Sequence, residues 1–94
     1  MATRDRRFFL VERYVPSISA VSVGPAIRRL GQSTPRTAHH LYSVLVPDEE
    51  TCLSIFEASD AKAVEAANRQ ADFPVDRIVE VEVFPRPART LEER

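Results

Sequence analysis

The chain has 94 residues, a length that suits one domain with a single modest core. Its 13 basic and 14 acidic residues give a formal net charge of −1, which excludes a strong overall attraction to nucleic acid or anionic membranes. Cys52 is the only cysteine, so no intrachain disulfide can form, and no apolar run reaches the ~18 residues of a membrane helix. We therefore expect a cytoplasmic protein that binds neither nucleic acid nor membrane.

The first third of the chain predicts a strand followed by a helix. Segment 7–15 is rich in Phe, Val and Tyr, residues that favour strands. A helix is expected over 20–30, with Gly31 ending it. The dipeptide Gly24-Pro25 lies inside this helix. Because proline lacks an amide donor, the helix either kinks there or begins at Pro25.

The rest of the chain predicts two strands, a second helix and a last strand. Strands over 37–46 and 51–57 are joined by the turn 47–50 and form a hairpin. A helix is expected over 59–71, where alanines recur at helical spacing. The last strand is expected over 76–84, before a proline-containing segment blocks further pairing.

The element order βαββαβ is typical of the ferredoxin-like fold. This α+β architecture has a four-stranded antiparallel sheet with both helices on one face. The domain is expected to span residues 7–85, with 1–6 and 86–94 as flexible tails.

The sheet face opposite the helices is expected to be covered by a second copy of the chain. The first strand is apolar on both faces, which implies that both are buried. In the last strand, valines at 79, 81 and 83 alternate with Glu80 and Glu82, so the valines are expected to face the helices. The sequence thus predicts a homodimer joined through its sheets.

Four groups of residues, spread from the first predicted strand to the last, form a recognisable combination: Phe9–Arg13 with Pro16, Ser43 with Asp48, Phe56–Ala58 with Asp60, and Phe73–Val81. This combination resembles a small, mostly uncharacterised bacterial family of ferredoxin-like domains, one member of which is described as a nickel-binding protein. The resemblance implies the ferredoxin-like fold and nickel as a candidate ligand. The chain departs from the family at Tyr42, where members often carry histidine, and at Ser54, where they often carry cysteine.

A metal site is suggested by a histidine and a carboxylate on neighbouring strands. Counting back from the turn 47–50, the hairpin register places His40 opposite Glu57 on one face. Imidazole and carboxylate together suit nickel or zinc. A cross-strand hydrogen bond without metal is the alternative. Further ligands would come from other strands or from a second chain: Glu12, Glu80 or Glu82.

Other chemistry is less favoured by the residue pattern. Cys52 lies in an apolar strand and is interpreted as an inert core thiol. The strand carboxylates could serve as an acid–base pair in a cleft, but salt bridges to Arg13 or Arg77 are the favoured interpretation. The arginines are not accompanied by the aromatic signature of RNA-binding sheets.

The sequence therefore predicts a small, non-enzymatic homodimer that binds nickel or another transition metal. The alternative is an enzyme or small-molecule binder of the dimeric α+β barrel type, like the monooxygenases and isomerases that hold an organic substrate between helices and sheet. A buried pocket reached by His40 or Tyr42 would favour that alternative. A purely structural assembly module is the third possibility.

Overall fold

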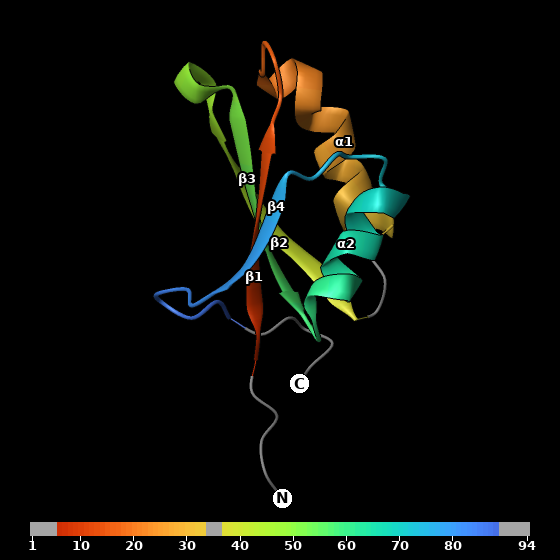
Figure 1. Cartoon of the computed structure of the whole chain (residues 1–94), viewed down its shortest axis with the longest axis vertical. Helices are drawn as coiled ribbons and strands as arrows, with labels where there is room; N and C mark the ends of the chain where they lie inside the picture. The colour runs from red at the N-terminus through yellow and green to blue at the C-terminus, as the bar shows by residue number, and fades with distance from the viewer. Residues whose placement is uncertain (1–5, 34–36, 89–94) are drawn as a thin grey trace, which may run out of the picture.

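The computed structural model describes residues 6–33 and 37–88 and contains the predicted βαββαβ order. Its elements are β1 (Phe8–Tyr14), α1 (Ala20–Ser33), β2 (Ala38–Val46), a 3₁₀ turn η1 (Pro47–Glu49), β3 (Thr51–Ala58), α2 (Ala61–Gln70) and β4 (Arg77–Val81). The strands form one antiparallel sheet in the order β2-β3-β1-β4, and both helices lie on one face of it (Figure 1). The ferredoxin-like prediction is confirmed. Neither of the two described helices is long and apolar enough to cross a membrane.

The core lies between the helices and the inward face of the sheet. Along β3 every second residue is buried, which is the period expected of a strand with one covered face. Phe56 of β3 and Phe9 of β1 lie side by side in the register and are almost fully buried. Leu30 of α1 and Val64 of α2 pack into the same cluster. Burying each such side chain contributes about 1.5–3 kcal/mol relative to its exposure to water.

Helix α1 runs through both residues that were expected to break or end it. The amide of Ser22 donates to Ser19 Oγ at 3.1 Å and the amide of Ser19 donates to Ser22 Oγ at 2.9 Å, so the helix start is fixed before Pro25. The proline leaves the carbonyl of Val21 without its helical donor, but Val21 is 88% exposed and water can replace that bond. Gly31 does not take a left-handed backbone, so the helix continues to Ser33 and the predicted end at Gly31 is wrong.

Helix α2 begins two residues later than predicted. Asp60 is its N-cap, with the carboxylate accepting a hydrogen bond from the amide of Ala63 at 2.9 Å. The buried face of α2 includes Val64, Ala67 and Asn68. A small alanine here lets the helix approach the sheet closely.

The register between β2 and β3 departs from the prediction beyond Tyr42. From the turn to Tyr42 the pairing is the predicted one, but a β-bulge then shifts it by one residue. His40 pairs with Phe56, and His39 pairs with Glu57. The predicted pairing of His40 with Glu57 is therefore wrong, because one inserted residue moves each histidine to the other face of the sheet.

Strand β4 also presents the opposite face to the one predicted. Val81 lies opposite Phe8, and Val79 shares its side, so these two valines lie on the face away from the helices. Ile78 and Glu80 lie on the helix side, where Ile78 packs against the core. Alternation alone indicates two faces without saying which is inward. The strand ends at Val81 because its partner strand begins at Phe8.

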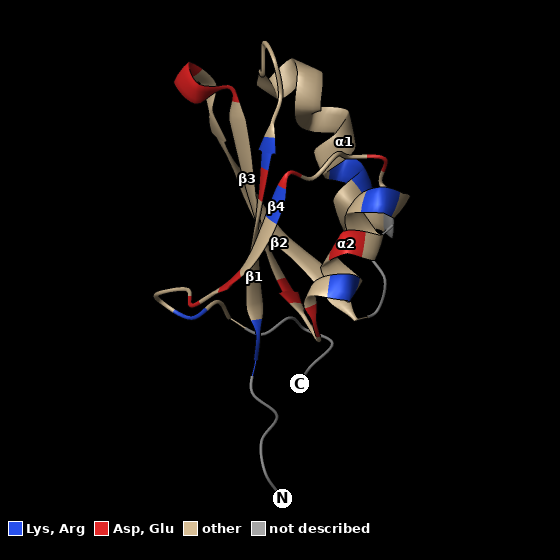
Figure 2. Cartoon of the chain, in the orientation of Figure 1, with Lys and Arg blue, Asp and Glu red and all other residues tan. Residues whose placement is uncertain are grey.

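The sheet face away from the helices is called the open face. No helix in the described ranges covers it (Figure 1). Strand β2, on the edge of the sheet, carries no charged side chain, whereas the turn η1 at its end is acidic (Figure 2). The half-buried or exposed apolar and aromatic residues of the open face include Leu10, Tyr14, Tyr42, Val44, Leu53, Ile55, Val79 and Val81.

Candidate functional site

The predicted metal ligands His40, Glu57, Glu12 and Glu80 do not come together in the folded chain. His40 lies on the helix side of β2, and Glu57 lies on the open face of β3. Glu12 is on the open face of β1, and Glu80 is on the helix side of β4. Among residues 6–33 and 37–88 there is no group of three or more His, Cys, Asp or Glu side chains placed to hold a metal ion.

Three of the four candidate glutamate ligands, Glu57, Glu80 and Glu12, are each paired with an arginine. Two of these pairs are bidentate: Arg6 contacts Glu57 at 2.7 and 2.8 Å, and Arg7 contacts Glu80 at 3.0 and 3.1 Å. The arginines neutralise the two carboxylates, as a bound metal cation otherwise would. The third pair, Arg77 with Glu12 at 2.7 Å, was among the salt bridges considered from the sequence.

The pKa values of two of these carboxyls follow from their pairing. The hydrogen bond from Arg77 lowers the pKa of Glu12, and the hydrogen bond from Arg7 lowers the pKa of Glu80. Both groups are therefore charged acceptors at neutral pH. Neither is a raised-pKa acid of the kind that general acid catalysis needs.

A hydrogen-bonded network of polar side chains lies on the helix side of the sheet. His40 Nε2 lies 2.8 Å from Ser43 Oγ, and Ser43 Oγ lies 2.7 Å from Ser54 Oγ. Arg13 is the last member of this network. Its Nη2 lies 3.5 Å from Ser54 Oγ and 2.7 Å from the Oδ1 of Asn68 on α2. Three strands and one helix are thus joined through hydrogen bonds inside the core.

Arg13 is the unexpected member of this network. It is 1% exposed, and its guanidinium stacks 3.8 Å from the centre of the Phe73 ring. Its Nε and Nη1 have no hydrogen-bond partner among the described residues. Burial lowers the pKa of Arg13 to about 10, so the side chain stays charged at neutral pH. The sequence-based interpretation of Arg13 as a surface salt-bridge residue is wrong, although its place on the same strand parity as Phe9 and Val11 was a usable signal.

Two of the titratable side chains near Arg13 are His40 and Cys52. Burial, followed by the nearby positive charge of Arg13, lowers the pKa of His40, so its imidazole is neutral at neutral pH. Burial raises the pKa of the Cys52 thiol, which agrees with the inert role expected from the sequence. A neutral imidazole can ligate a metal, but the Nε2 atom of His40 is already engaged with Ser43.

The bulge brings together a different histidine–carboxylate pair from the predicted one. His39 and Glu57 are cross-strand partners on the open face. Sequence reasoning missed His39 because nothing in the residue pattern signals the bulge. One imidazole and one carboxylate are suitable donors for nickel or zinc, but two donors are too few for a closed site.

The comparisons with known proteins agree with this fold. No curated protein matches the sequence. A family model described as "Nickel responsive protein SCO4226-like" matches residues 9–81, which is most of the chain. Among solved structures, the chain is similar to the crystal structure of SCO4226 from Streptomyces coelicolor A3(2), with 18% sequence identity and a TM-score of 0.68. The match covers 81% of this chain and 96% of the other, and at this identity it shows a shared fold.

The family match includes strands β1 to β4 and both helices. It confirms the resemblance that the residue combination in the four strands indicated. The chain therefore belongs to the nickel-responsive, SCO4226-like family.

Proposed function

We propose that the protein is a non-enzymatic, homodimeric nickel-responsive domain in which the open face of the sheet joins two copies. The main support for the dimer is the row of apolar side chains on the open face, among them Tyr42, which is 45% exposed, and Val44, which is 49% exposed. A contiguous apolar surface of this kind is typical of an interaction site. Self-association needs no partner other than the chain itself.

The family description supports nickel as the metal to which this domain responds. The donor set of one chain fits only part of a site, because His39 and Glu57 supply one imidazole and one carboxylate. Two copies supply four such donors, which is why we propose a site shared between chains. Glu57 would exchange its contact with Arg6 for the metal. We also propose a cytoplasmic location, in keeping with the single cysteine.

The alternative of a substrate pocket between helices and sheet has less support. Tyr42 lies on the open face, away from the helices, and the imidazole of His40 is bonded to Ser43. Neither of the two residues that would favour the enzyme reading therefore projects freely into the space beneath the helices.

The dimer is tested by measuring molar mass in solution with light scattering, using two matched valine variants. Wild-type protein is expected at twice the chain mass. Val44→Asp on the open face is expected to give monomers, because the interface would have to bury a charge. Val21→Asp on the exposed side of α1 should leave the dimer intact. A wild-type monomer at micromolar concentration, or dissociation by both variants alike, would contradict the proposal.

The metal site is tested by calorimetric titration of nickel into tag-free protein. We expect near-stoichiometric binding per dimer that is lost in His39→Gln and in Glu57→Gln. Glu65→Gln, an exposed change on α2, is the control and should bind as wild type does. Val44→Asp separates the two parts of the proposal. If Val44→Asp is monomeric and binds nickel with unchanged affinity, the site is not shared between chains. If wild-type protein gives no binding heat at micromolar nickel, the proposal that it binds nickel is wrong.

A further inference from the structure

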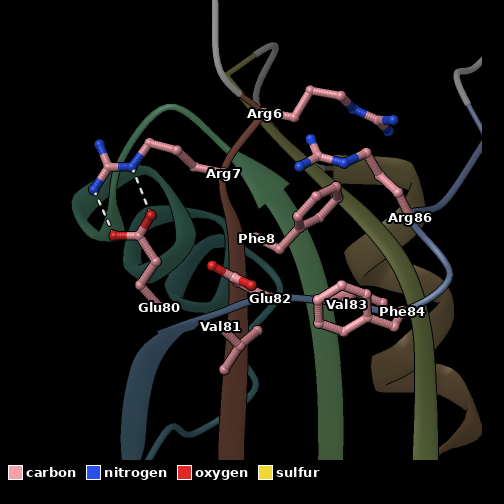
Figure 3. Close-up of a pocket in the computed structure, with 9 residues that line it drawn as sticks. All are labelled: Arg6, Arg7, Phe8, Glu80, Val81, Glu82, Val83, Phe84 and Arg86. Carbon is pink, nitrogen blue, oxygen red and sulfur yellow. Dashed lines mark hydrogen bonds and ion pairs between the residues drawn. The ribbon is translucent and has the colours of Figure 1, made fainter.

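A cavity of about 680 Å³ lies where β1 begins and β4 ends (Figure 3). Small-molecule sites have volumes of roughly 300–1,000 Å³, so the space suits a small organic ligand. Part of its wall is apolar and comes from both strands and from the segment after β4: Phe8, Val81, Val83 and Phe84. The ring of Phe84 is 83% exposed, which leaves a large apolar surface for a ligand to cover.

Most charged groups at this cavity already have partners. Arg7 pairs with Glu80 across the cavity wall, as the dashed lines in Figure 3 show. Arg6 is held by Glu57 and also donates to the backbone oxygen of Pro87 at 2.7 Å. These contacts fix the two arginines that precede Phe8 and leave them less able to bind a ligand.

Two charged lining residues of opposite sign remain, Arg86 and Glu82. The guanidinium of Arg86 lies 5.8 Å from the centre of the Phe8 ring. Neither Arg86 nor Glu82 makes a hydrogen bond or ion pair with the part of the chain that the structure describes. The cavity therefore offers one cation, one carboxylate and a neighbouring apolar wall.

We propose that this cavity binds a free amino acid with an aromatic or branched aliphatic side chain. Arg86 pairs with the carboxylate of the ligand, Glu82 pairs with its ammonium group, and the apolar side chain packs against Phe84 and the half-buried Val83. Charge-assisted hydrogen bonds at both ends favour a zwitterion. An anion alone would meet repulsion from Glu82, and a cation alone would meet repulsion from Arg86. This function does not require nickel, and its cavity shares Val81 with the open face proposed as the dimer interface.

The test is a titration of the full-length, ¹⁵N-labelled protein, followed by amide chemical shifts. L-phenylalanine is expected to give saturable shifts around residues 8, 82 and 86 at millimolar concentration. Phenylpropionate lacks the ammonium group and phenethylamine lacks the carboxylate, so each should bind about tenfold more weakly, as the loss of one charged contact of about 1.4 kcal/mol predicts. No saturable shift, or equal affinity for all three compounds, would overturn the proposal.

Two variants assign the contacts. Arg86→Gln should weaken L-phenylalanine about tenfold but bind phenethylamine at least as well as wild type does, because the repulsion from Arg86 is gone. Glu82→Gln should also weaken L-phenylalanine about tenfold but bind phenylpropionate at least as well as wild type does. Both residues are exposed, so both variants should melt as wild type does. Arg69→Gln, on the exposed side of α2, is the control and should bind normally. Equal weakening of every ligand by one variant would show that the residue does not contact the expected group and would overturn the assignment.

Discussion

The two faces of the sheet place charge in opposite ways. On the helix side, Arg13 is buried without an ion pair to any carboxylate in residues 6–33 and 37–88, and it contacts an amide oxygen and an aromatic ring. On the open face, Glu12 meets Arg77 and Glu57 meets Arg6 in direct ion pairs, around a centre of apolar side chains. Beneath the helices a charge is thus held only within a hydrogen-bonded network, whereas outside the packed core charges stay in direct ion pairs, as Arg7 and Glu80 also do. The difference predicts unequal responses to mutation.

The largest expected effect comes from adjacent residues on β3 that face opposite ways. Phe56→Ala on the helix side should lower the free energy of unfolding by about 4 kcal/mol, because it leaves a cavity in a packed core. Ile55→Ala on the open face should cost about 1 kcal/mol at low protein concentration. Urea unfolding measures both. If the two variants lose the same free energy of unfolding at every protein concentration, the open face is already covered within one chain.

The next effect concerns the buried network. Asn68→Leu removes the 2.7 Å acceptor of Arg13 and leaves a buried cation without a strong partner, so it should destabilise the protein by about 3 kcal/mol. Adding Arg13→Met should recover part of that loss, because the double variant no longer buries a charge. If the double variant is as unstable as the sum of the single ones, the two side chains are not coupled.

A smaller effect is expected from His40. Its pKa in the folded protein lies below the ordinary value of 6.5, so protonation favours the unfolded chain. The stability that neutral His40 contributes is therefore complete above about pH 6.5 and declines as the pH falls below that value. His40→Gln should flatten the pH dependence of the melting temperature in this window. A slope that survives the substitution would have to come from another group.

The smallest effect is expected at the open-face ion pair of Glu12 and Arg77. Both side chains reach solvent, so Glu12→Gln should change stability less than Ile55→Ala does. The lowered pKa of Glu12 means that its contribution is present above the ordinary carboxyl value of 4.5 and is lost as the pH falls through the lowered one. Urea unfolding at neutral and acidic pH checks this, with high salt as the control because salt screens exposed pairs.

The sequence predicted the elements better than their faces. Strand and helix positions follow from residue pattern, and the element order then leaves few topologies, so the ferredoxin-like fold could be predicted. Which face of β4 points inward could not be predicted, because Val79 and Glu80 alternate in either case. Only the packing of Ile78 against the core decides it. The length of α1 was also missed, because Gly31 ends a helix only in a left-handed conformation.

The candidate site was harder to predict than the fold. Its register depended on one residue between His40 and Tyr42, and a bulge has no composition signal in a single sequence. That one residue exchanges His40 for His39 as the neighbour of Glu57. The arginine partners of Glu57 and Glu80 are Arg6 and Arg7, 51 and 73 residues away in the sequence, and these contacts appear only once the sheet is assembled.

The bulge in β2 has a further consequence for how the molecule avoids aggregation. Strand β2 lies at an edge of the sheet, with nine residues whose outer backbone groups could template another strand. The irregularity between His40 and Tyr42 breaks that row into two shorter stretches, and an incoming strand would have to match the same irregularity to pair along its whole length. The edge is thereby protected against growth into a continuous intermolecular sheet, even though β2 carries no charged side chain to repel another chain.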